Sequence, residues 1–413
     1  MGWGKFFCTR LSNICTRIGL SMLLVALAAC SGGGSSGGDG LLRVSLTDAP
    51  GCGYANVWVT VVDVRVHQSP SAGDAAAGWV SIGPGAPLRL DLLRLRNGVL
   101  RELGVESLPA GRYQQIRLVL AGNAQAGTPV ANAITLEADP QTEIALSTPS
   151  AQQTGLKLPA NIEVPAGGEA DVVLDFDACR SVVKRGSSGE YNLKPVVAVI
   201  PLVSAGGITG EIEVPSENDA AQSIRVTAQL AGVVVKETVI DQGQRFNLFP
   251  VPNGNYDVVF VASGRATHVI GEVPVLTGVS TPLGTVPLDF ETTSGIAPAS
   301  GTLAPNTADP ITVRALRHAT ADKEVEVASG IFVPAQGWVL QLPTAPLQYA
   351  APSFGALPFT APEMSFSAYS PTPPPQEPSY RFIASATGFS DTSSGPVVVG
   401  GDPDAAYNFT LTP

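Results

Sequence analysis

The 413-residue sequence is poor in charged, aromatic and histidine side chains. Only 14% of its residues are charged, where about 25% is usual, 6% are aromatic and 3 are histidine. The 24 basic residues are outnumbered by 35 acidic ones, which argues against a nucleic-acid binder. The 44 glycines and 35 prolines argue against a helical protein because both residues break helices. Since 44% of the residues are hydrophobic, a disordered chain is excluded as well.

The first 29 residues have the pattern of an export signal. Three basic residues precede an apolar run over 18–27, which is too short to span a bilayer core of about 30 Å as a helix. The run ends in Leu27-Ala28-Ala29-Cys30, which resembles the bacterial lipobox. The resemblance implies that residues 1–29 are removed and that Cys30 is lipidated. An ordinary cleaved signal beside an incidental cysteine is the alternative.

Residues 30–40 follow as a tether. Their Gly/Ser-rich sequence is typical of a flexible linker, which lets a lipid-anchored domain stand off a membrane. Ser31 occupies the position after the lipidated cysteine, where the usual inner-membrane retention signal would place aspartate. By the same resemblance we expect an outer-membrane lipoprotein of the bacterial cell envelope, facing the periplasm or the cell surface.

The anchor accounts for the odd number of cysteines, which is 5. Cys8 and Cys15 leave with the signal and Cys30 takes the lipid, so Cys52 and Cys179 remain in a compartment that permits disulfides. We expect these two to pair, with two buried free thiols as the alternative. The chain has no Cys-x-x-Cys motif, so a metal or nucleophile role has little support.

Residues 41–203 are predicted to form a first domain of short strands. Tyr54–His67 is a long run rich in valine, and Arg112–Leu120 alternates between apolar and polar side chains. About ten such segments are separated by turn signals such as Asn97-Gly98. The pattern predicts an all-β protein with a larger N-terminal β-sandwich.

Four segments of this domain resemble the bacterial lipoprotein family that contains domain of unknown function 4382. They are VSLTDAPGCGYANVWVTVVDVRVH (44–67), LPAGRYQQIRLVLA (108–121), QTGLKL (153–158) and VVLDFDACRSVVKRGSSGEYNLKPVVAVI (172–200). The resemblance implies a β-rich envelope domain and supplies no catalytic residues. Cys52 and Cys179 lie inside two of the matching segments, which fits a disulfide between them.

Residues 206–290 and 295–413 resemble two copies of one smaller module. Ser223–Gln229 matches Pro310–Leu316, and in each copy a tyrosine (Tyr256, Tyr380) precedes a glycine by eight residues. The pattern resembles carboxypeptidase-regulatory-like (prealbumin-like) β-sandwich modules, which implies tandem Ig/prealbumin-like sandwiches after the first domain. The second copy is longer by a proline-rich insertion over 341–378, for which we expect a loop or polyproline II conformation.

An acidic set in the first domain is the main candidate for chemistry: Asp48, Asp63, Asp175 and Asp177. Ca²⁺ prefers several oxygen ligands, and Asp175-x-Asp177 would place two carboxylates on one face of a strand, about 7 Å apart. The alternative is structural: Asp48 caps its turn, and Asp175 and Asp177 pair with nearby basic residues such as Arg180. Ca²⁺ is therefore a candidate ligand, and no other cofactor is expected.

Two further site hypotheses have less support. Paired carboxylates serve glycosidases, but the sequence does not show whether any two lie at a suitable separation. Four aromatic residues of the first domain could instead form a sugar-binding face or pack in the core: Trp58, Trp79, Tyr113 and Tyr191.

The sequence as a whole predicts a non-catalytic, lipid-anchored envelope protein with a binding or structural role. The first domain would carry recognition and the two later modules would act as spacers. Expected partners are the membrane, through the lipid, and an envelope protein or glycan, with no nucleic acid. The alternative is a calcium- or carbohydrate-binding module that is accessory to an envelope hydrolase system.

Overall fold

The computed structural model describes residues 38–48, 53–123, 130–148, 155–185, 188–213, 224–288, 294–306, 310–368, 378–400 and 406–413. The expected signal, Cys30, most of the tether and Cys52 lie outside these residues. Strands dominate the described residues, and the helical segments are single turns. No helix in these ranges is both long and apolar enough to cross a membrane. The all-β class expected from the composition is confirmed.

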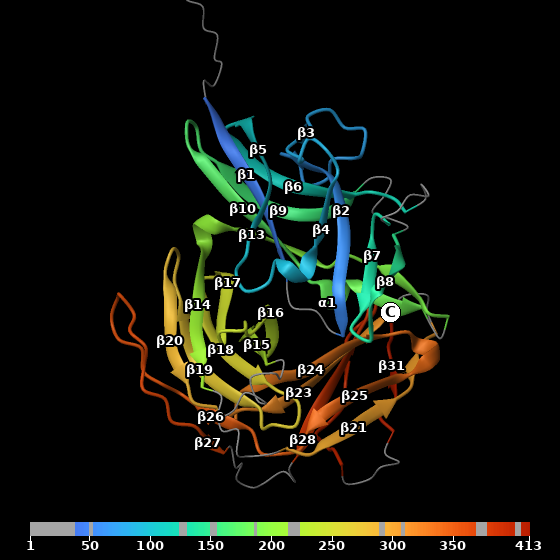
Figure 1. The fold of residues 1–413 in the computed structure, drawn as a ribbon, viewed down its shortest axis with the longest axis vertical. Coiled ribbons are helices and arrows are strands. Elements are labelled where there is room, and N and C mark those ends of the chain that lie inside the picture. The colour runs from blue at the N-terminus through green and yellow to red at the C-terminus, as the bar shows by residue number, and fades with distance from the viewer. Residues whose placement is uncertain are drawn as a thin grey trace, which may run out of the picture. The chain divides into compact units, whose positions relative to one another are not determined.

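The first sandwich packs two sheets against each other (Figure 1). One has the order β13 (Val197–Pro201), β10 (Glu169–Phe176), β1 (Asp39–Asp48), β5 (Arg101–Pro109). The other has the order β11 (Val182–Arg185), β12 (Glu190–Leu193), β8 (Asp139–Ser147), β7 (Ala133–Leu136), β2 (Tyr54–His67), β6 (Gly111–Leu120), β9 (Leu156–Val164), with β3 (Val80–Ser81) and β4 (Leu88–Asp91) also paired to β2. Alternate residues of the strands, such as Leu42 and Val44, fill the core between the sheets.

The second sandwich has its own hydrophobic core between two sheets. One sheet has the order β17 (Arg245–Pro252), β14 (Ala205–Ile212), β20 (Ser280–Val286). The other begins β16 (Val233–Val239), β15 (Arg225–Leu230), β18 (Gly254–Val261), β19 (His268–Val275). Core side chains such as Leu248 from the first sheet and Val258 from the second are fully buried.

The third sandwich has a main sheet and smaller strand pairs. The main sheet has the order β24 (Glu324–Phe332), β23 (Ile311–His318), β28 (Ser379–Ser385), β29 (Thr392–Ser393), with β30 (Val397–Val398) also paired to β28. It packs against the pairs β21 (Ile296–Gly301) with β25 (Trp338–Pro343) and β22 (Leu303–Ala304) with β31 (Phe409–Thr410). The matching repeat segments occupy equivalent places, since β15 lies between β16 and β18 as β23 lies between β24 and β28.

A tyrosine hydroxyl bonded to a proline carbonyl recurs in the three sandwiches of the described chain. Tyr113 and Tyr256 each donate to the proline carbonyl four residues earlier, at 3.1 and 2.8 Å. Tyr380 donates to the carbonyl of Pro343 at 2.7 Å. Buried tyrosines need a partner for the hydroxyl. In the first two sandwiches this bond fixes the start of a strand against the chain that leads into it, and in the third it fixes β28 against the end of β25.

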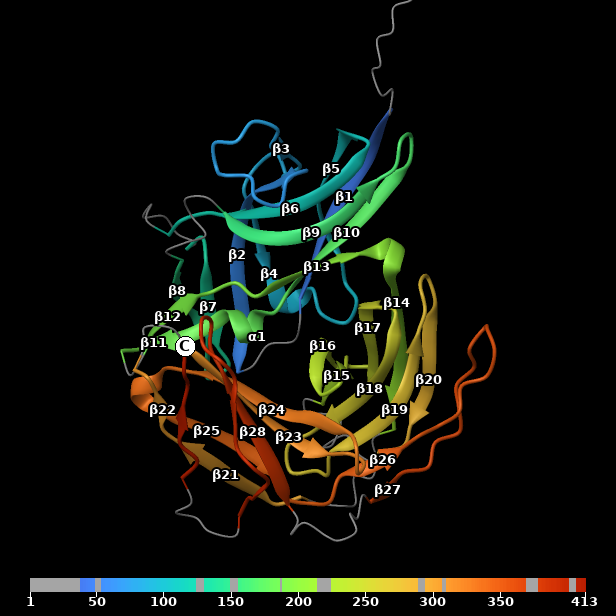
Figure 2. The same ribbon diagram turned by 180° about the vertical axis from the view of Figure 1, so that it is seen from behind.

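We expected the proline-rich insertion to be a loop or a polyproline II segment, but two short strands lie within it. Within it, β26 (Gln348–Ala350) pairs with β19 of the second sandwich, and β27 (Ser367–Ala368) pairs with β26. Figures 1 and 2 show both strands, in orange, beside the yellow strands of the second sandwich. The third module thus extends the sheet of the second.

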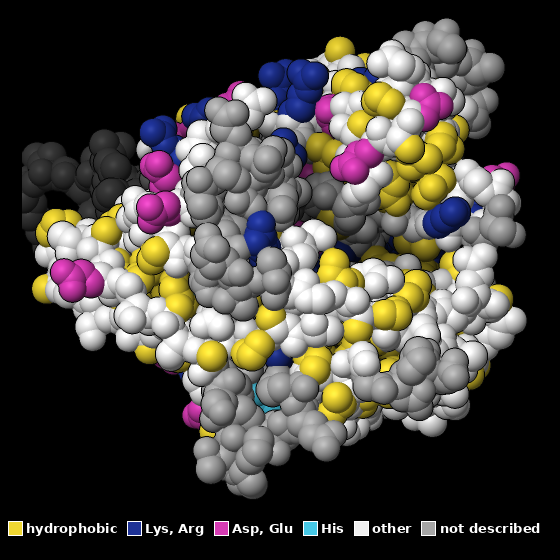
Figure 3. Space-filling model, turned by 60° about the horizontal axis from the view of Figure 1, so that its bottom comes forward, with side chains coloured by type: hydrophobic (Ala, Val, Ile, Leu, Met, Phe, Trp, Pro, Cys, Tyr) yellow, Lys and Arg dark blue, Asp and Glu magenta, His cyan; other side chains and the backbone are white. Residues whose placement is uncertain are grey.

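Figure 3 views the molecule from the side that carries these two strands, and most charged side chains in that view lie in its upper half.

Candidate functional site

The structure keeps Asp48, Asp175 and Asp177 of the predicted calcium site near one another and places Asp63 apart from them. Asp63 pairs with Arg65 at 2.7 Å and accepts a hydrogen bond from Ser81, on β2 away from the other three. Among the described residues, no group of three or more His, Cys, Asp or Glu side chains is arranged to hold a metal ion. The calcium hypothesis is therefore not supported by this arrangement.

The placement of Asp175 and Asp177 on one face of a strand is wrong. Strand β10 ends at Phe176, and Asp177 is the N-cap of the single helical turn α1 (Ala178–Ser181). Its carboxylate accepts the backbone N–H of Arg180 at 2.8 Å, which is the usual role of aspartate at that position. Leu174 and Phe176 of β10 are fully buried in the first core.

Asp48 ends β1 as a fully buried side chain. Its Oδ1 accepts the backbone N–H of Ala178 at 3.0 Å, and its Oδ2 has no hydrogen-bond partner. Burial raises the pKa of Asp48 well above its usual value, and the Ala178 N–H lowers it only in part. Burial therefore favours the neutral form of this carboxyl more than in an exposed aspartate, and its Oδ1 helps to fix the start of α1. Asp48 thus has a structural contact with the helical turn α1, while its own turn, where we expected the contact, lies outside the described residues.

Asp175 is paired across a boundary between sandwiches. Its Oδ1 accepts a hydrogen bond from the ammonium of Lys236 on β16, at 2.6 Å, and the two side chains are 10% and 1% exposed. A lysine so deeply buried is tolerated only with a charged partner at hand. The first sandwich thus supplies the carboxylate that neutralises a buried cation of the second. We had expected a basic partner within the first domain.

Asp177 faces the same boundary. Its pKa is raised to about 7, chiefly by burial and then by the charges of Glu237 and, more weakly, Asp175, while the Arg180 backbone N–H and guanidinium lower it in part. The Arg180 guanidinium lies 3.9 Å from the carboxylate. The boundary therefore brings several carboxylates together, and their charges help to raise the pKa of Asp177.

The third sandwich joins the same region through Arg225. This residue pairs with Glu237 at 2.8 Å and donates to the carbonyl of Val327 on β24 at 2.5 Å. Its pKa is raised because the nearby carboxylates Glu237 and Glu326 outweigh its burial. Gln229 binds the backbone of Glu326 in both directions, at 2.8 and 2.7 Å. We call this region, built on Asp175, Asp177, Lys236, Glu237, Arg225 and Glu326, the charged junction.

Sequence reasoning identified only the two aspartates of the charged junction. Lys236 shares a face of β16 with Thr238, opposite Val235, which packs against the core of the second sandwich. Sequence alone does not show that this polar face is buried, and a lysine buried there needs a carboxylate partner. Nothing in the sequence indicates that this partner is 61 residues earlier.

The cysteines are only partly described. Cys179, in α1, is disulfide-bonded, and its partner lies outside the described residues. The pairing of Cys179 with Cys52 and the lipidation of Cys30 stay predictions, because Cys30 and Cys52 both lie in the part of the chain that is not described.

The four aromatic candidates do not form a common exposed face. Tyr113 and Tyr191 are buried in the first core. The guanidinium of Arg89 lies 4.3 Å from the ring centre of Trp58, and that of Arg117 lies 4.6 Å from the ring centre of Trp79. Each of these two rings has one face covered by a guanidinium, and both tryptophans are half-buried outside the core, so the core-packing alternative is supported for Tyr113 and Tyr191 only.

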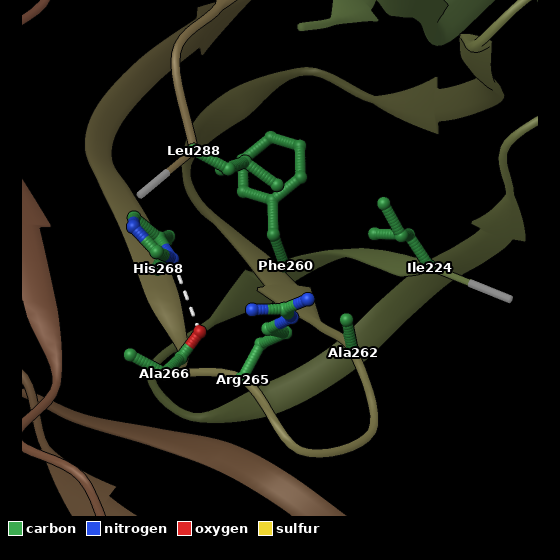
Figure 4. A pocket seen from close by; sticks show the side chains of 7 residues that line it. All are labelled: Ile224, Phe260, Ala262, Arg265, Ala266, His268 and Leu288. Atoms are coloured by element: carbon green, nitrogen blue, oxygen red, sulfur yellow. Dashed lines mark hydrogen bonds between the residues drawn. The ribbon is translucent and has the colours of Figure 1, made fainter. Parts of the chain in front are cut away.

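A small hollow lies at one end of the second sandwich. Apolar side chains of Ile224, Phe260 and Leu288 line it with Arg265 and His268, and its free space is about that of one water molecule. Figure 4 shows His268 beside Leu288, with a dashed line from the imidazole to the carbonyl of Ala266, at 3.1 Å. The hollow is too small for an organic substrate.

These features define an all-β protein of packed sandwiches whose buried charges connect one sandwich to the next. Residues 39–195 match the family model described as domain of unknown function (DUF4382). The first sandwich is therefore similar to the DUF4382 domain, as its motifs indicated. No curated protein is similar enough to match the chain.

Solved structures show only low similarity. A type II cohesin–X-dockerin complex from Acetivibrio cellulolyticus is 23% identical over 19% of this chain and 52% of that chain, with a TM-score of 0.17, so the match spans about half of that chain. A streptococcal ancillary pilin (7% identity, 90% and 98% coverage, TM-score 0.17) and two B repeat units of the Staphylococcus aureus collagen-binding protein (9%, 90% and 98%, 0.18) also match. TM-scores this low carry no argument, and the β-sandwich fold rests on the sheets described above.

Proposed function

We propose that this protein is a non-catalytic, lipid-anchored protein of the bacterial cell envelope, with a binding or structural role. The lipobox-like Leu27–Cys30 and the Gly/Ser-rich tether support the anchor. The DUF4382 domain would carry recognition of an envelope protein or a glycan. The outer membrane is the proposed location, and a disulfide between Cys52 and Cys179 would strengthen the domain there.

The observation that carries this proposal is the charged junction. Its acids and bases are engaged with each other across sandwich boundaries, as in the pair of Lys236 with Asp175. A further contact has the same character, since Arg314 of β23 pairs with Glu326 and donates to the carbonyl of Gly232. Groups used in this way hold the sandwiches together. The later modules, which we expected to act as spacers, are then held to their neighbouring sandwiches by buried or half-buried polar contacts.

The anchor is tested by membrane fractionation of cells that express the full chain. Wild type should sediment with outer membranes, and Cys30→Ser should appear in the soluble fraction. Cys52→Ser serves as the control, because it removes a cysteine and its expected disulfide but leaves Cys30 in place, and it should stay with the membranes. Retention of Cys30→Ser in the membranes would contradict the lipid anchor.

The non-catalytic role is tested on the purified full chain. We expect no turnover of chromogenic esters or glycosides, and hydrolysis that copurifies with the monomeric protein would overturn the proposal. Calorimetric titration with Ca²⁺ tests the calcium-binding alternative. We expect no saturable heat, and a signal lost in Asp175→Asn would instead support the alternative.

A further inference from the structure

The proline-rich insertion places a separate cover over the second sandwich. We define the cover as residues 351–368, which follow β26 and include β27. Phe354, Met364 and Phe366 of the cover pack against the core of the second sandwich. The ring of Phe366 meets the imidazole of His268 edge-on, with 5.0 Å between ring centres. The three side chains of the cover thus occupy apolar positions on the second sandwich, which we call the seats.

Glycines of the second sandwich are matched to the insertion. A Cβ at Gly271 of β19 would collide with the hydroxyl of Tyr349, and a Cβ at Gly284 of β20 would lie 2.8 Å from the Cβ of Ala361. Gly284 also needs its glycine for a positive φ of 67°. Gly271 has no positive φ, so its backbone conformation does not require glycine. The space taken by Tyr349 of the insertion explains why this position has no side chain.

The cover is nonetheless weakly held. None of its residues is buried, and Leu357 is 55% exposed. Strand β27 pairs with β26 through only Ser367 and Ala368. Strand β26 is held more firmly, because Leu347, just before it, and Ala350, at its end, are buried. Segments with few buried contacts open at a low free-energy cost compared with core strands. Opening the cover would expose the outer edge of β26 and the seats of the three anchors, while β26 stays in place.

We propose that the cover is a displaceable self-ligand, and that the seats beneath it bind an extended, uncharged segment of a partner protein that carries apolar anchors two residues apart. The cover shows the chemistry of this occupant: Glu363 is its single charged residue, and Met364 and Phe366 stand at i and i+2. A partner segment would pair with the edge of β26 and place its anchors in the vacated seats, as in recognition by strand addition. This site is independent of the lipid anchor and of recognition by the first sandwich.

The test uses the full chain purified in detergent and a fluorescent synthetic peptide of residues 351–368. Phe354→Ala/Phe366→Ala removes two anchors of the cover and leaves the seats intact. Ala361→Trp opens the cover from another point, because Gly284 leaves no room for the larger side chain. Leu357→Ala is the matched control, since it removes an exposed apolar side chain from the same segment.

Both opened variants should bind the peptide at least about tenfold more tightly than wild type and Leu357→Ala, in which the tethered cover competes at a high effective concentration. Near-UV circular dichroism checks that each variant is folded. Folded opened variants that fail to bind, or equal binding by Leu357→Ala, would overturn the proposal. A complex between wild-type and opened chains would overturn the foreign partner in favour of a second copy.

Discussion

The charged junction predicts that Asp177→Asn stabilises the protein in a pH-dependent way. Asparagine caps a helix about as well as aspartate, so the bond to the Arg180 N–H is kept. The pKa of Asp177 is about 7 in place of 3.8. A folded-state pKa that is raised for an acid means that ionisation opposes folding. The contribution of Asp177 to the free energy of unfolding is therefore fully present below pH 3.8 and is lost as the pH rises through about 7.

The size of the effect follows from the shift. About three units at about 1.4 kcal/mol each give an upper value of about 4 kcal/mol at pH 8. Because the carboxylate is 24% exposed, solvent screens part of this, and we expect about 2 kcal/mol. At pH 3.5 both side chains are neutral and the variant should equal wild type.

Urea unfolding of the full chain at pH 3.5 and pH 8 measures the effect. Asp139→Asn, at an exposed position of β8, is the control and should change the free energy of unfolding at neither pH. Equal stabilisation at the two pH values, or a loss of stability at pH 8, would refute the electrostatic reasoning.

Three further predictions concern contacts within and between the sandwiches. Asp175→Ala leaves Lys236 buried without its carboxylate and should cost about 3–5 kcal/mol in urea unfolding, most of it recovered by adding Lys236→Met; a cost below about 1 kcal/mol would contradict the pairing. Tyr256→Phe removes the bond to the Pro252 carbonyl and should cost about 1 kcal/mol by the same method; an unchanged stability would contradict it. Gly271→Ala should lower the melting temperature by about 2–4 °C, with partial recovery on adding Tyr349→Phe; absence of recovery would show that the tyrosine hydroxyl is not what the added methyl meets.

Several elements could be predicted because their signals are local. The alternation in Arg112–Leu120 and the valine-rich run Tyr54–His67 place strands that the structure contains as β6 and β2. The DUF4382 domain was recognisable from its motifs, and residues 39–195 match that family. The tyrosine that binds a proline carbonyl follows a glycine by two residues in both Gly254-Asn255-Tyr256 and Gly111-Arg112-Tyr113, which is a local signal that the first two sandwiches share.

The misplaced elements lacked such a signal. The turn α1 is too short to show a helical period, so Asp177 was assigned to the strand that ends one residue before it. The insertion over 341–378 has a proline content that predicts a loop, yet Gln348–Ala350 adds to a neighbouring sheet because β19 offers an open edge.

The sequence by itself determined that this is an all-β protein of sandwiches, because strand alternation and turn residues are properties of neighbouring positions. Only the tertiary structure decided that Asp175 neutralises Lys236 and that a segment of the third module covers the second. Both depend on burial of residues that are distant in the chain, since a charge in an apolar interior must find its partner wherever the fold supplies one.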